Sequence, residues 1–370
     1  MSKKMGIISA CAHRLYLYRP ELFGTLWDAG YEVVVFGPES QAEGDKWLGE
    51  LGIKYVELPL ERRQTDPLAE LKAQALITQT VSQDAIGLLF SYGIRFAPLA
   101  NNSAKRAGIP CINVINGLGN LFIERGKSGA AKRAAILPYL KASLSYSSRI
   151  IFQNYDDRDL FYSLKLGSPH QYLNVCGSGV NTARYPVCPL PHKKVFGFLS
   201  RLNPEKGIHE LLSAFENVLT QYPDVRLILA GELDGIRSET EDLLGKLIES
   251  GSADYLGEID DVRPFFNEVR YFVFPSYREG TPRVNLEAMS CGRPIITTDA
   301  PGCRETVRDG VNGLLVKVRD VETLEKAMLR FCDDDDMTAR MAEQSRKIAE
   351  EKFDVHSVNR ILLGEIQKVL

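Results

Sequence analysis

The stretch FPSYREGTPRVNLEAMSCGRP, residues 274–294, contains the end of a strand, a loop and the start of a helix. The apolar residues 271–274 predict a buried strand, and the loop that follows it ends at Gly280. We expect Thr281 to cap the helix and Pro282 to take its first position, because proline needs no hydrogen-bond partner there. The free N–H groups of a first helical turn attract anions, and a glycine lets a ligand approach the backbone closely. The stretch therefore predicts a pocket for a phosphorylated ligand.

Two carboxylates, Glu279 and Glu287, lie on either side of the expected helix start. A carboxylate accepts hydrogen bonds from neighbouring hydroxyl groups, so one can hold a sugar and the other a ribose, with a diphosphate between them. The alternative is that Glu279 caps or pairs locally and that Glu287 is an ordinary solvated helix residue. Taken alone, the two carboxylates leave both interpretations open.

A second loop of this kind is SRLNPEKG, residues 200–207. An apolar run precedes it and a helical pattern over residues 208–219 follows it, so Arg201 and Lys206 are expected at the carboxyl end of a strand. Open parallel sheets bind their ligands at that end. Two cations there can neutralise a diphosphate.

Arg201 and Lys206 in SRLNPEKG, with Glu279 and Glu287 in EGTPRVNLE, resemble the signature of retaining, nucleotide-sugar-dependent glycosyltransferases with the GT-B fold. The resemblance continues through AMSCGRPIITTDAPGCRETVRDGVNGLLV, residues 288–316. It implies an α/β protein of two doubly wound Rossmann-like domains that face a cleft, with the donor mainly in the second domain and the acceptor mainly in the first. The UDP-sugar is then a co-substrate, and neither a metal nor a cofactor is expected.

The resemblance also implies roles for individual residues. Glu287 would hold the ribose hydroxyls and Glu279 the transferred sugar, while Arg201 and Lys206 would stabilise the charge that develops on the leaving UDP. Arg201, Lys206 and Glu279 are thus the candidate catalytic residues, and no nucleophile is assigned. The candidate donor-binding residues are Gly117, Gly119, Arg201, Lys206, Glu279, Gly280, Thr281, Arg283, Val284, Asn285 and Glu287.

Length and composition fit this class of protein. With 370 residues the chain is long enough for two domains, each with its own core, and 44% hydrophobic and 25% charged residues exclude disordered and fibrous proteins. The net charge of −3 divides into +5 for residues 1–185 and −8 for the rest, so the first half is expected near anionic partners. The seven cysteines are scattered without a C-x-x-C pair, which predicts neither structural disulfides nor a zinc site.

The order of the apolar runs predicts alternating strands and helices in both halves. No G-x-G-x-x-G follows the first strand, which disfavours enzymes with a dinucleotide fingerprint. The proline-rich residues 185–194 are the expected linker. The expected strands are residues 5–9, 31–36, 53–58, 87–90, 111–115, 149–152 and 172–175 in the first half, and 195–199, 225–229, 271–274, 295–298 and 314–316 in the second.

We therefore expect an N-terminal acceptor-binding domain at residues 1–185 and a C-terminal nucleotide-sugar-binding domain at residues 186–352. Residues 353–370 have a helical apolar period, and the resemblance places this helix across on the first domain. No apolar run is long enough for a signal peptide or a membrane span. The protein is therefore expected in the cytoplasm, with only peripheral membrane attachment.

Loops after strands of the first half are expected to carry the acceptor. Gly117 and Gly119 follow one strand, and they favour either a close approach to the donor diphosphate or simply a tight turn. His13, Arg19 and Arg95 are candidate acceptor ligands, and the alternative for each is an ordinary structural or surface role.

The segment 122–149 has six basic residues against one acid, with Ile136, Leu140 and Leu144 on one helical face. This pattern predicts an amphipathic contact with an anionic membrane surface, and Pro138 is expected to kink or restart the helix. The alternative is a core-facing helix with a solvated basic side. The candidate membrane contacts are Arg125, Lys127, Lys132, Arg133 and Lys141.

The order of SACAHRLYLYRPEL, SYGIRFAPLA, INGLGNLFIERG and SYREGTPRVNLEAMSCGRPIITTDAPGC resembles bacterial N-acetylgalactosaminyltransferases that act on undecaprenyl-diphospho-bacillosamine. This implies a metal-independent, retaining transfer of a sugar, N-acetylgalactosamine as the first choice, from a UDP-sugar to an undecaprenyl-diphosphate-linked saccharide. The enzyme would serve surface-glycan or glycoprotein-glycan assembly at the inner face of the cytoplasmic membrane, without a nucleic-acid partner. Another UDP-hexose donor, a soluble acceptor, a UDP-sugar epimerase and a non-catalytic sugar-nucleotide-binding protein are the alternatives.

Overall fold

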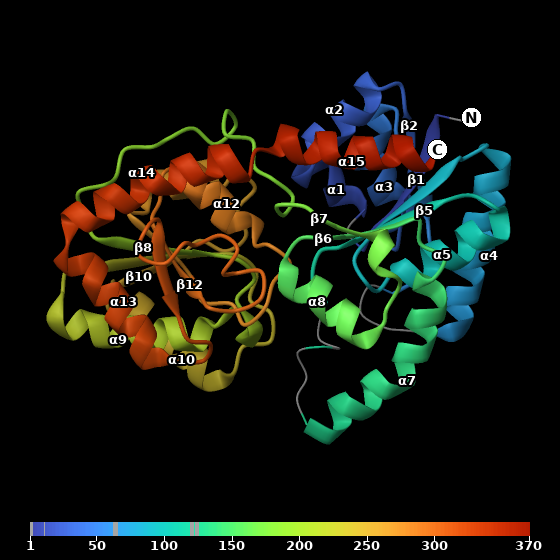
Figure 1. Cartoon of the computed structure of the whole chain (residues 1–370). Coiled ribbons are helices and arrows are strands. Elements are labelled where there is room, and N and C mark those ends of the chain that lie inside the picture. Colours follow the sequence, from blue (N-terminus) through green and yellow to red (C-terminus); the bar gives the residue numbers. More distant parts are fainter. Residues whose placement is uncertain (1–2, 11, 62–65, 119–121, 123–125) are drawn as a thin grey trace. The chain divides into compact units, whose positions relative to one another are not determined.

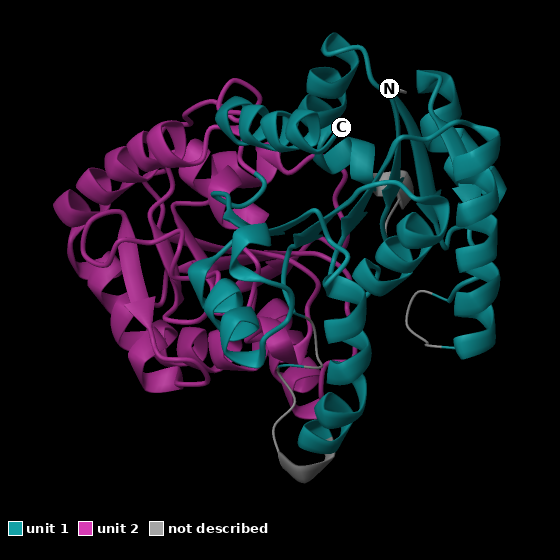
Figure 2. Cartoon of the chain, turned by 45° about the vertical axis from the view of Figure 1, so that its right-hand side comes forward, with its two compact units in different colours: residues 1–178, 356–370 teal, residues 179–355 magenta. Residues whose placement is uncertain are grey.

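The computed structural model describes residues 3–10, 12–61, 66–118, 122 and 126–370. The chain divides into two compact units, which Figure 2 distinguishes by colour. Unit 1 comprises Met1–Ser178 and His356–Leu370, and unit 2 comprises Gly179–Val355. The boundaries expected from sequence were 185/186 and 352/353. Each unit contains one parallel sheet with helices around it (Figure 1).

The sheet of unit 1 has the strand order β3-β2-β1-β4-β5-β6-β7 and is parallel throughout. All seven strands predicted for the first half of the chain form. They are β1 Lys4–Ile8, β2 Glu32–Gly37, β3 Lys54–Glu57, β4 Leu88–Tyr92, β5 Cys111–Ile115, β6 Arg149–Phe152 and β7 Tyr172–Asn174. The described helices are α1 Ala12–Tyr18, α2 Pro20–Asp28, α3 Gln41–Leu48, α4 Pro67–Gln83, α5 Ala97–Ala107, α7 Gly126–Leu144, α8 Tyr155–Leu164 and α15 Val355–Val369, with short 3-10 turns at Gly49–Leu51 and Pro169–Gln171.

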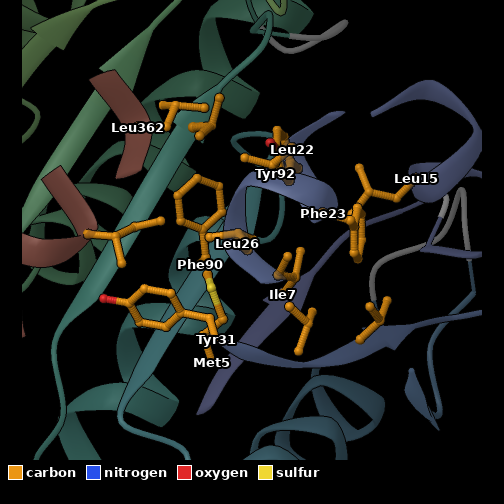
Figure 3. Packing of buried hydrophobic residues seen from close by; sticks show 14 of the residues in the cluster. Met5, Ile7, Leu15, Leu22, Phe23, Leu26, Tyr31, Phe90, Tyr92 and Leu362 are labelled. Carbon is orange, nitrogen blue, oxygen red and sulfur yellow. The ribbon is translucent and has the colours of Figure 1, made fainter. Parts of the chain in front are cut away.

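Both faces of this sheet are buried. Successive residues of a strand point to opposite faces, so Ile7 and Phe90 pack in one core cluster and their neighbours Ile8 and Leu89 pack in another. This explains why the strands are almost continuously apolar rather than alternating. The first cluster also contains Val358, Leu362 and Ile366 of α15, and Figure 3 shows part of it.

The order of the strands in unit 1 reverses between β1 and β4. The chain runs outward from β1 through β2 and β3, then returns to the other side of β1, where Ile8 of β1 lies opposite Ser91 of β4. The loops that leave the carboxyl ends of β1 and β4 therefore diverge. Such a switch point is where open parallel sheets leave a crevice for a ligand.

The sheet of unit 2 has the order β10-β9-β8-β11-β12-β13, and its switch point lies between β8 and β11. The five predicted strands form, whereas sequence analysis missed the three-residue edge strand β10. The strands are β8 Val195–Leu199, β9 Arg226–Ala230, β10 Ala253–Tyr255, β11 Tyr271–Phe274, β12 Ile295–Thr298 and β13 Gly313–Val316. The helices are α9 Ile208–Gln221, α10 Ser238–Glu249, α11 Arg263–Glu268, α12 Arg283–Ser290, α13 Val321–Asp333 and α14 Asp335–Lys352, with a 3-10 turn at Pro204–Lys206. The fold class predicted from sequence is thereby confirmed.

The proline-rich segment expected as a linker is tied to unit 2. The guanidinium of Arg293 is fully buried, and its Nη2 donates to Pro189 O at 3.0 Å. Arg270 donates in the same way to Pro191 O. Two buried arginines thus hold these carbonyl groups against the sheet.

The first and last residues of unit 2 are hydrogen-bonded to each other. The N–H of Val180 donates to Phe353 O at 2.7 Å, and the N–H of Val355 donates to Val180 O at 3.2 Å. Gly179 has φ +73, and a Cβ there would collide with the backbone of Val355. The two ends of unit 2 therefore lie next to each other. Along the sequence, unit 2 is inserted between the two segments of unit 1.

Helix α7 continues through Pro138, so the helix does not restart at this residue. Its C-terminal half packs on unit 1, because Leu140 and Leu144 are buried in a core cluster with Phe152. Ile136, expected on the same apolar face, is exposed. For Leu140 and Leu144 the core-facing alternative is thus correct, and these two residues leave no apolar membrane face. None of the helices in the described part of the chain is both long and apolar enough to cross a bilayer.

Candidate active site

The loop after β8 is shaped by a short capped turn. Asn203 accepts a hydrogen bond from the N–H of Lys206 at 3.2 Å and so caps the turn Pro204–Lys206. Gly207 then takes φ +72, and a Cβ at this position would collide with Pro275 O. Only glycine allows this approach without strain. The loop that carries Lys206 is thereby packed against the loop that follows β11.

Lys206 and Glu279 form an ion pair across the switch point of unit 2. The Nζ of Lys206 contacts Oε1 of Glu279, and Ser276 donates its hydroxyl to the same oxygen at 2.6 Å. Both charged side chains are more than four-fifths buried, at 18% and 17% exposure. Glu279 therefore has both a local partner, Ser276, and an ion-pair partner from a different loop, Lys206.

The loop after β12 supports Glu279 from the other side. The N–H of Glu279 donates to Pro301 O at 3.0 Å, and Gly302 has φ +78. A Cβ on Gly302 would collide with the carbonyl oxygens of Glu279 and Gly280. Burial, and then the charge of Glu279, raises the pKa of the Cys303 thiol to about 12, so this neighbour stays neutral. The loop after β12 thus holds the backbone of Glu279, while Lys206 and Ser276 contact its carboxylate.

Arg201 lies on the same edge of the sheet but has a different partner. Its Nη1 is 2.5 Å from Oδ2 of Asp234, in the loop after β9, and its side chain is about half exposed. Asp234 is fixed by its own N–H, which donates to Leu202 O at 3.0 Å. Arg201 and Lys206 therefore lie on one loop, and each is paired with an acid from another.

Helix α12 starts later than predicted. It begins at Arg283, Pro282 takes the cap position and no side chain caps the helix, so the expectation that Thr281 caps and Pro282 comes first is wrong. The reason is that Pro282 has ψ 112, an extended value, although its φ of −67 would suit a helix. The first turn is closed instead by the N–H of Asn285, which donates to Pro282 O at 3.1 Å.

Glu287 is not the solvated helix residue of the alternative interpretation. It is 7% exposed, and Arg283 one turn earlier donates its Nε to Glu287 Oε1 at 2.7 Å. Burial and then the charge of Glu287 raise the pKa of Tyr185 to about 12, which places this hydroxyl beside the pair. Burial lowers the pKa of Arg283, but Glu287 and Tyr185 outweigh this and raise it overall.

The remaining donor candidates are placed in different ways. Asn285 is fully buried and donates its Nδ2 to the hydroxyl of Thr306 at 2.9 Å, so it holds the segment after β12. Gly280 is buried and Val284 is partly exposed. Gly117 belongs to unit 1 and has φ +125, which favours glycine, whereas Gly119 lies outside the described residues.

The described acceptor candidates of unit 1 have different partners. The guanidinium of Arg19 is buried beside Asn359, whereas Arg95 donates to Glu61 O at 2.7 Å and lies over the ring of Phe96. The side chain of His13 lies outside the described residues, as do Arg125 and the side chain of Lys127. The exposed cations of α7 include Lys132 and Lys141, and Arg133 is half-buried.

Sequence analysis missed four partners of the candidate residues. Asp234 pairs with Arg201, Ser276 binds Glu279, Tyr185 lies beside Glu287, and Asn359 binds Arg19. Only Ser276 carried a usable signal, because it lies two residues after the end of the predicted strand. Among the described residues, no group of three or more His, Cys, Asp or Glu could hold a metal ion. The acidic run 333–336 contributes a helix cap, because Asp334 accepts a hydrogen bond from the N–H of Met337 at 2.7 Å at the start of α14.

Comparison with known proteins agrees with this architecture. Solved structures of Anabaena HepE with UDP-glucose (TM-score 0.80, 20% identity, 99% of each chain) and of sucrose-phosphate synthase from Thermosynechococcus elongatus (0.78, 18%, 99% and 98%) have the same fold. The chain is thus a two-unit α/β protein of the GT-B architecture.

The sequence comparisons find similarity to glycosyltransferases. Residues 189–348 match the family "Glycosyl transferases group 1". Over 356 residues the chain is 24% identical to an N,N'-diacetylbacillosaminyl-diphospho-undecaprenol alpha-1,3-N-acetylgalactosaminyltransferase of Campylobacter jejuni, covering 94% of both. It is 26% identical over 385 residues to the putative glycosyltransferase EpsD of Bacillus subtilis, covering 96% and 97%. The match to the group 1 glycosyl transferases therefore lies within unit 2 and covers most of it.

Proposed function

We propose that this chain is a retaining glycosyltransferase that moves a sugar from a UDP-sugar to a hydroxyl of an undecaprenyl-diphosphate-linked saccharide. The observation that carries the proposal is the ion pair of Lys206 with Glu279 at the switch point of unit 2, with Arg201 on the same loop as Lys206. It places two cations and a carboxylate where a parallel sheet binds its ligand. The Campylobacter relative and the UDP-glucose complex of HepE support the choice of acceptor and donor classes.

The cations act on the leaving group. Cleavage of the bond between the anomeric carbon and the UDP oxygen leaves negative charge on the diphosphate. Arg201 and Lys206 stabilise this charge, and the first-turn N–H groups of α12 at Arg283 and Val284 add donors at the positive end of a helix. These cations and N–H groups supply the positive charge that a bound metal ion supplies in metal-dependent enzymes. The proposed reaction therefore needs no metal ion.

The carboxylates hold the hydroxyl groups of the donor. In the proposal, Lys206 turns from Glu279 to the diphosphate, and Glu279 then accepts hydrogen bonds from the sugar. Ser276 keeps the carboxylate oriented during this exchange, since it donates to the same oxygen. Glu287, fixed by Arg283, accepts the ribose hydroxyls.

The experiment that tests the function is a UDP-release assay. The protein is incubated with a panel of UDP-sugars, with and without a short-chain polyprenyl-diphosphate-linked saccharide, and the product is analysed by NMR. We expect release from UDP-N-acetylgalactosamine only when the lipid-linked acceptor is present, and an α-linked product from the α-linked donor. Release with a soluble acceptor alone would contradict the lipid-linked acceptor. Conversion of the donor sugar without any acceptor would identify an epimerase.

We further propose that α7 brings unit 1 to an anionic membrane. Since Leu140 and Leu144 face the core, the proposed contact is the part of α7 before Leu140, which extends from the rest of unit 1 (Figure 2) and exposes Lys132, Ile136 and Tyr139. Each basic side chain near anionic headgroups contributes about 1 kcal/mol, which is about a fivefold change in affinity.

Vesicle binding tests this contact. We expect Lys132→Gln with Arg133→Gln to weaken binding to phosphatidylglycerol vesicles by roughly 25-fold, as two such contributions multiply. Lys105→Gln with Arg106→Gln is the matched control, because these exposed cations end α5 and carry the same charge. Equal loss in both double variants would show that only net charge matters.

A further inference from the structure

Arg19 of unit 1 is a buried cation without an acidic partner. The residue lies between α1 and α2, is 6% exposed, and donates its Nη2 to Asn359 Oδ1 at 3.1 Å. Its Nε is buried and unpartnered, and no carboxylate in the described part of the chain forms an ion pair with it. A buried charge is strongly disfavoured unless it is paired. The surroundings of Arg19 therefore require an anion.

Two more unpartnered donors belong to the residues around Arg19. The guanidinium lies over the ring of Tyr92, with Cζ at 5.9 Å from the ring centre, and the Tyr92 hydroxyl is buried without a partner. Burial raises the pKa of Tyr92, against a smaller lowering by Arg19, so the hydroxyl keeps its proton. The Nδ2 of Asn359, whose Oδ1 binds Arg19, is also buried and unpartnered. All three unsatisfied atoms are donors.

The position of these residues in the fold is that of a ligand site. Tyr92 is the last residue of β4, the strand that pairs with β1 at the switch point of unit 1, and Arg19, at the junction of α1 and α2, reaches this strand end by lying over the Tyr92 ring. Asn359 is added by α15, which packs into the core of the same unit. Arg19 and Tyr92 each keep 6% of their surface exposed, but the three unpartnered atoms themselves are buried, so a phosphate reaches them only when the side chains around them move.

We propose that Arg19, Tyr92 and Asn359 bind a phosphate group at the switch point of unit 1. A phosphate has only acceptor oxygens and a negative charge, which matches three donors and a guanidinium without an acid. Resting on the proposed function, we assign this phosphate to the diphosphate of the lipid-linked acceptor. The sugars attached to that diphosphate would then be positioned by a fixed charge in unit 1.

The rival interpretation is structural. Arg19 could serve only to attach α15 to the junction of α1 and α2, with solvent satisfying the remaining donors. The two interpretations predict different melting temperatures and phosphate affinities for Tyr92→Phe, because the hydroxyl that is removed has no protein partner. If it serves only a ligand, its removal leaves the melting temperature unchanged or raises it and weakens phosphate binding. If it is part of the structure, its removal lowers the melting temperature and leaves binding unchanged.

The first arm of the test measures binding of inorganic pyrophosphate by calorimetry to the full chain saturated with UDP, which occupies the proposed donor site. We expect one site per chain, at least tenfold weaker in Arg19→Gln and in Tyr92→Phe, and unchanged in Arg106→Gln. Arg106 is an exposed arginine at the end of α5 and serves as the charge-matched control. Equal binding by the wild type and both site variants would overturn the proposal, even if Arg19→Gln folds poorly, because Tyr92→Phe is judged separately.

The second arm identifies the source of the phosphate. We expect Tyr92→Phe to raise the KM for the polyprenyl-diphosphate-linked acceptor severalfold and to leave the KM for the UDP-sugar unchanged. Orthophosphate inhibition that is equal in wild type and variant, with an unchanged acceptor KM, would overturn the assignment to the acceptor. Pyrophosphate binding without any sugar transfer would contradict the proposed function and support the phosphate site, so the two failures are distinguishable.

Discussion

The switch points of the two units differ in how the charge of a largely buried cation is compensated. In unit 2, Lys206 meets the carboxylate of Glu279, which also accepts from Ser276, and both charges are compensated within the protein. In unit 1, Arg19 meets an amide oxygen, a tyrosine ring and two further donors. The unit 2 group follows the carboxyl ends of β8 and β11, and the unit 1 group is built around Tyr92 at the carboxyl end of β4. In unit 2 a protein carboxylate compensates the charge of the cation. In unit 1 no carboxylate among the described residues does so.

This difference predicts different behaviour towards ligands. A phosphorylated ligand entering unit 2 competes with Glu279 for Lys206, so part of its binding energy is used to break an existing ion pair. A phosphate entering unit 1 displaces no protein acid and relieves a desolvated charge. The paired site is suited to a ligand whose charge changes during a reaction, and the unpaired site to one that is only held.

The largest expected effect is on the paired site. We expect Lys206→Ala to lower kcat by roughly 100- to 1,000-fold, because it removes a donor to the leaving group. The free energy of unfolding should fall by only about 1–2 kcal/mol, since Glu279 keeps its hydrogen bond from Ser276 and some contact with water. Steady-state kinetics and urea denaturation measure the two effects. Lys193→Ala, at an exposed position in the segment before β8, is the control and should change neither.

The second prediction makes the unpaired site resemble the paired one. Asn359→Asp gives Arg19 a carboxylate in nearly the same volume, and the lost Nδ2 has no partner. We expect the unfolding free energy to rise by about 1–2 kcal/mol at pH 7 and pyrophosphate binding to be lost. The folded-state pKa of the new Asp lies below its unfolded value of about 4, so the gain is present above that pH and disappears as the pH falls.

Urea denaturation of Asn359→Asp at pH 7 and at pH 3 measures this gain. A less stable variant at pH 7 would show that the charge of Arg19 is already compensated, and the contrast between the two switch points would fail. Asn359→Leu, which removes the acceptor without adding a charge, is the matched comparison and should destabilise the protein.

The smallest expected effect concerns Arg201, the half-exposed cation of unit 2. In the proposed complex, Asp234 competes with the diphosphate for Arg201. Asp234→Asn should therefore tighten UDP binding about two- to fourfold. This is the size expected when an exposed ion pair contributes less than about 1 kcal/mol. Calorimetric titration with UDP measures this at low and high salt, and the gain should shrink at high salt. Weaker binding would mean that Asp234 positions Arg201 rather than competing for it.

The strands of both sheets were predictable because they are buried on both faces and read as apolar runs. β10 is the exception, since Ala253, Asp254 and Tyr255 show no apolar pattern and form a strand only by pairing with β9. The α12 cap was misplaced by one position because the φ of Pro282 fits a helix and its ψ does not. Local residue preferences cannot resolve such a difference.

The candidate site was predictable only in part. Arg201, Lys206, Glu279 and Glu287 carry charge at fixed spacings after strand ends, and their assigned roles stay predictions. Their partners depend on sheet order, which the sequence does not display: Asp234 and Asn359 become neighbours of Arg201 and Arg19 only through folding. The role of α7 was equally ambiguous, because an apolar face fits a core and a membrane alike, and only packing showed that Leu140 and Leu144 face the core.

The joined ends of unit 2 have a consequence for the order of synthesis. A ribosome makes residues 1–178 before unit 2, but the core of unit 1 lacks Val358, Leu362 and Ile366 until α15 emerges. Unit 2 is continuous in sequence and precedes these residues, so it can fold as a unit before the core of unit 1 is complete. Unit 1 is therefore started before unit 2 and completed after it, and Arg19 meets Asn359 only once α15 has been made.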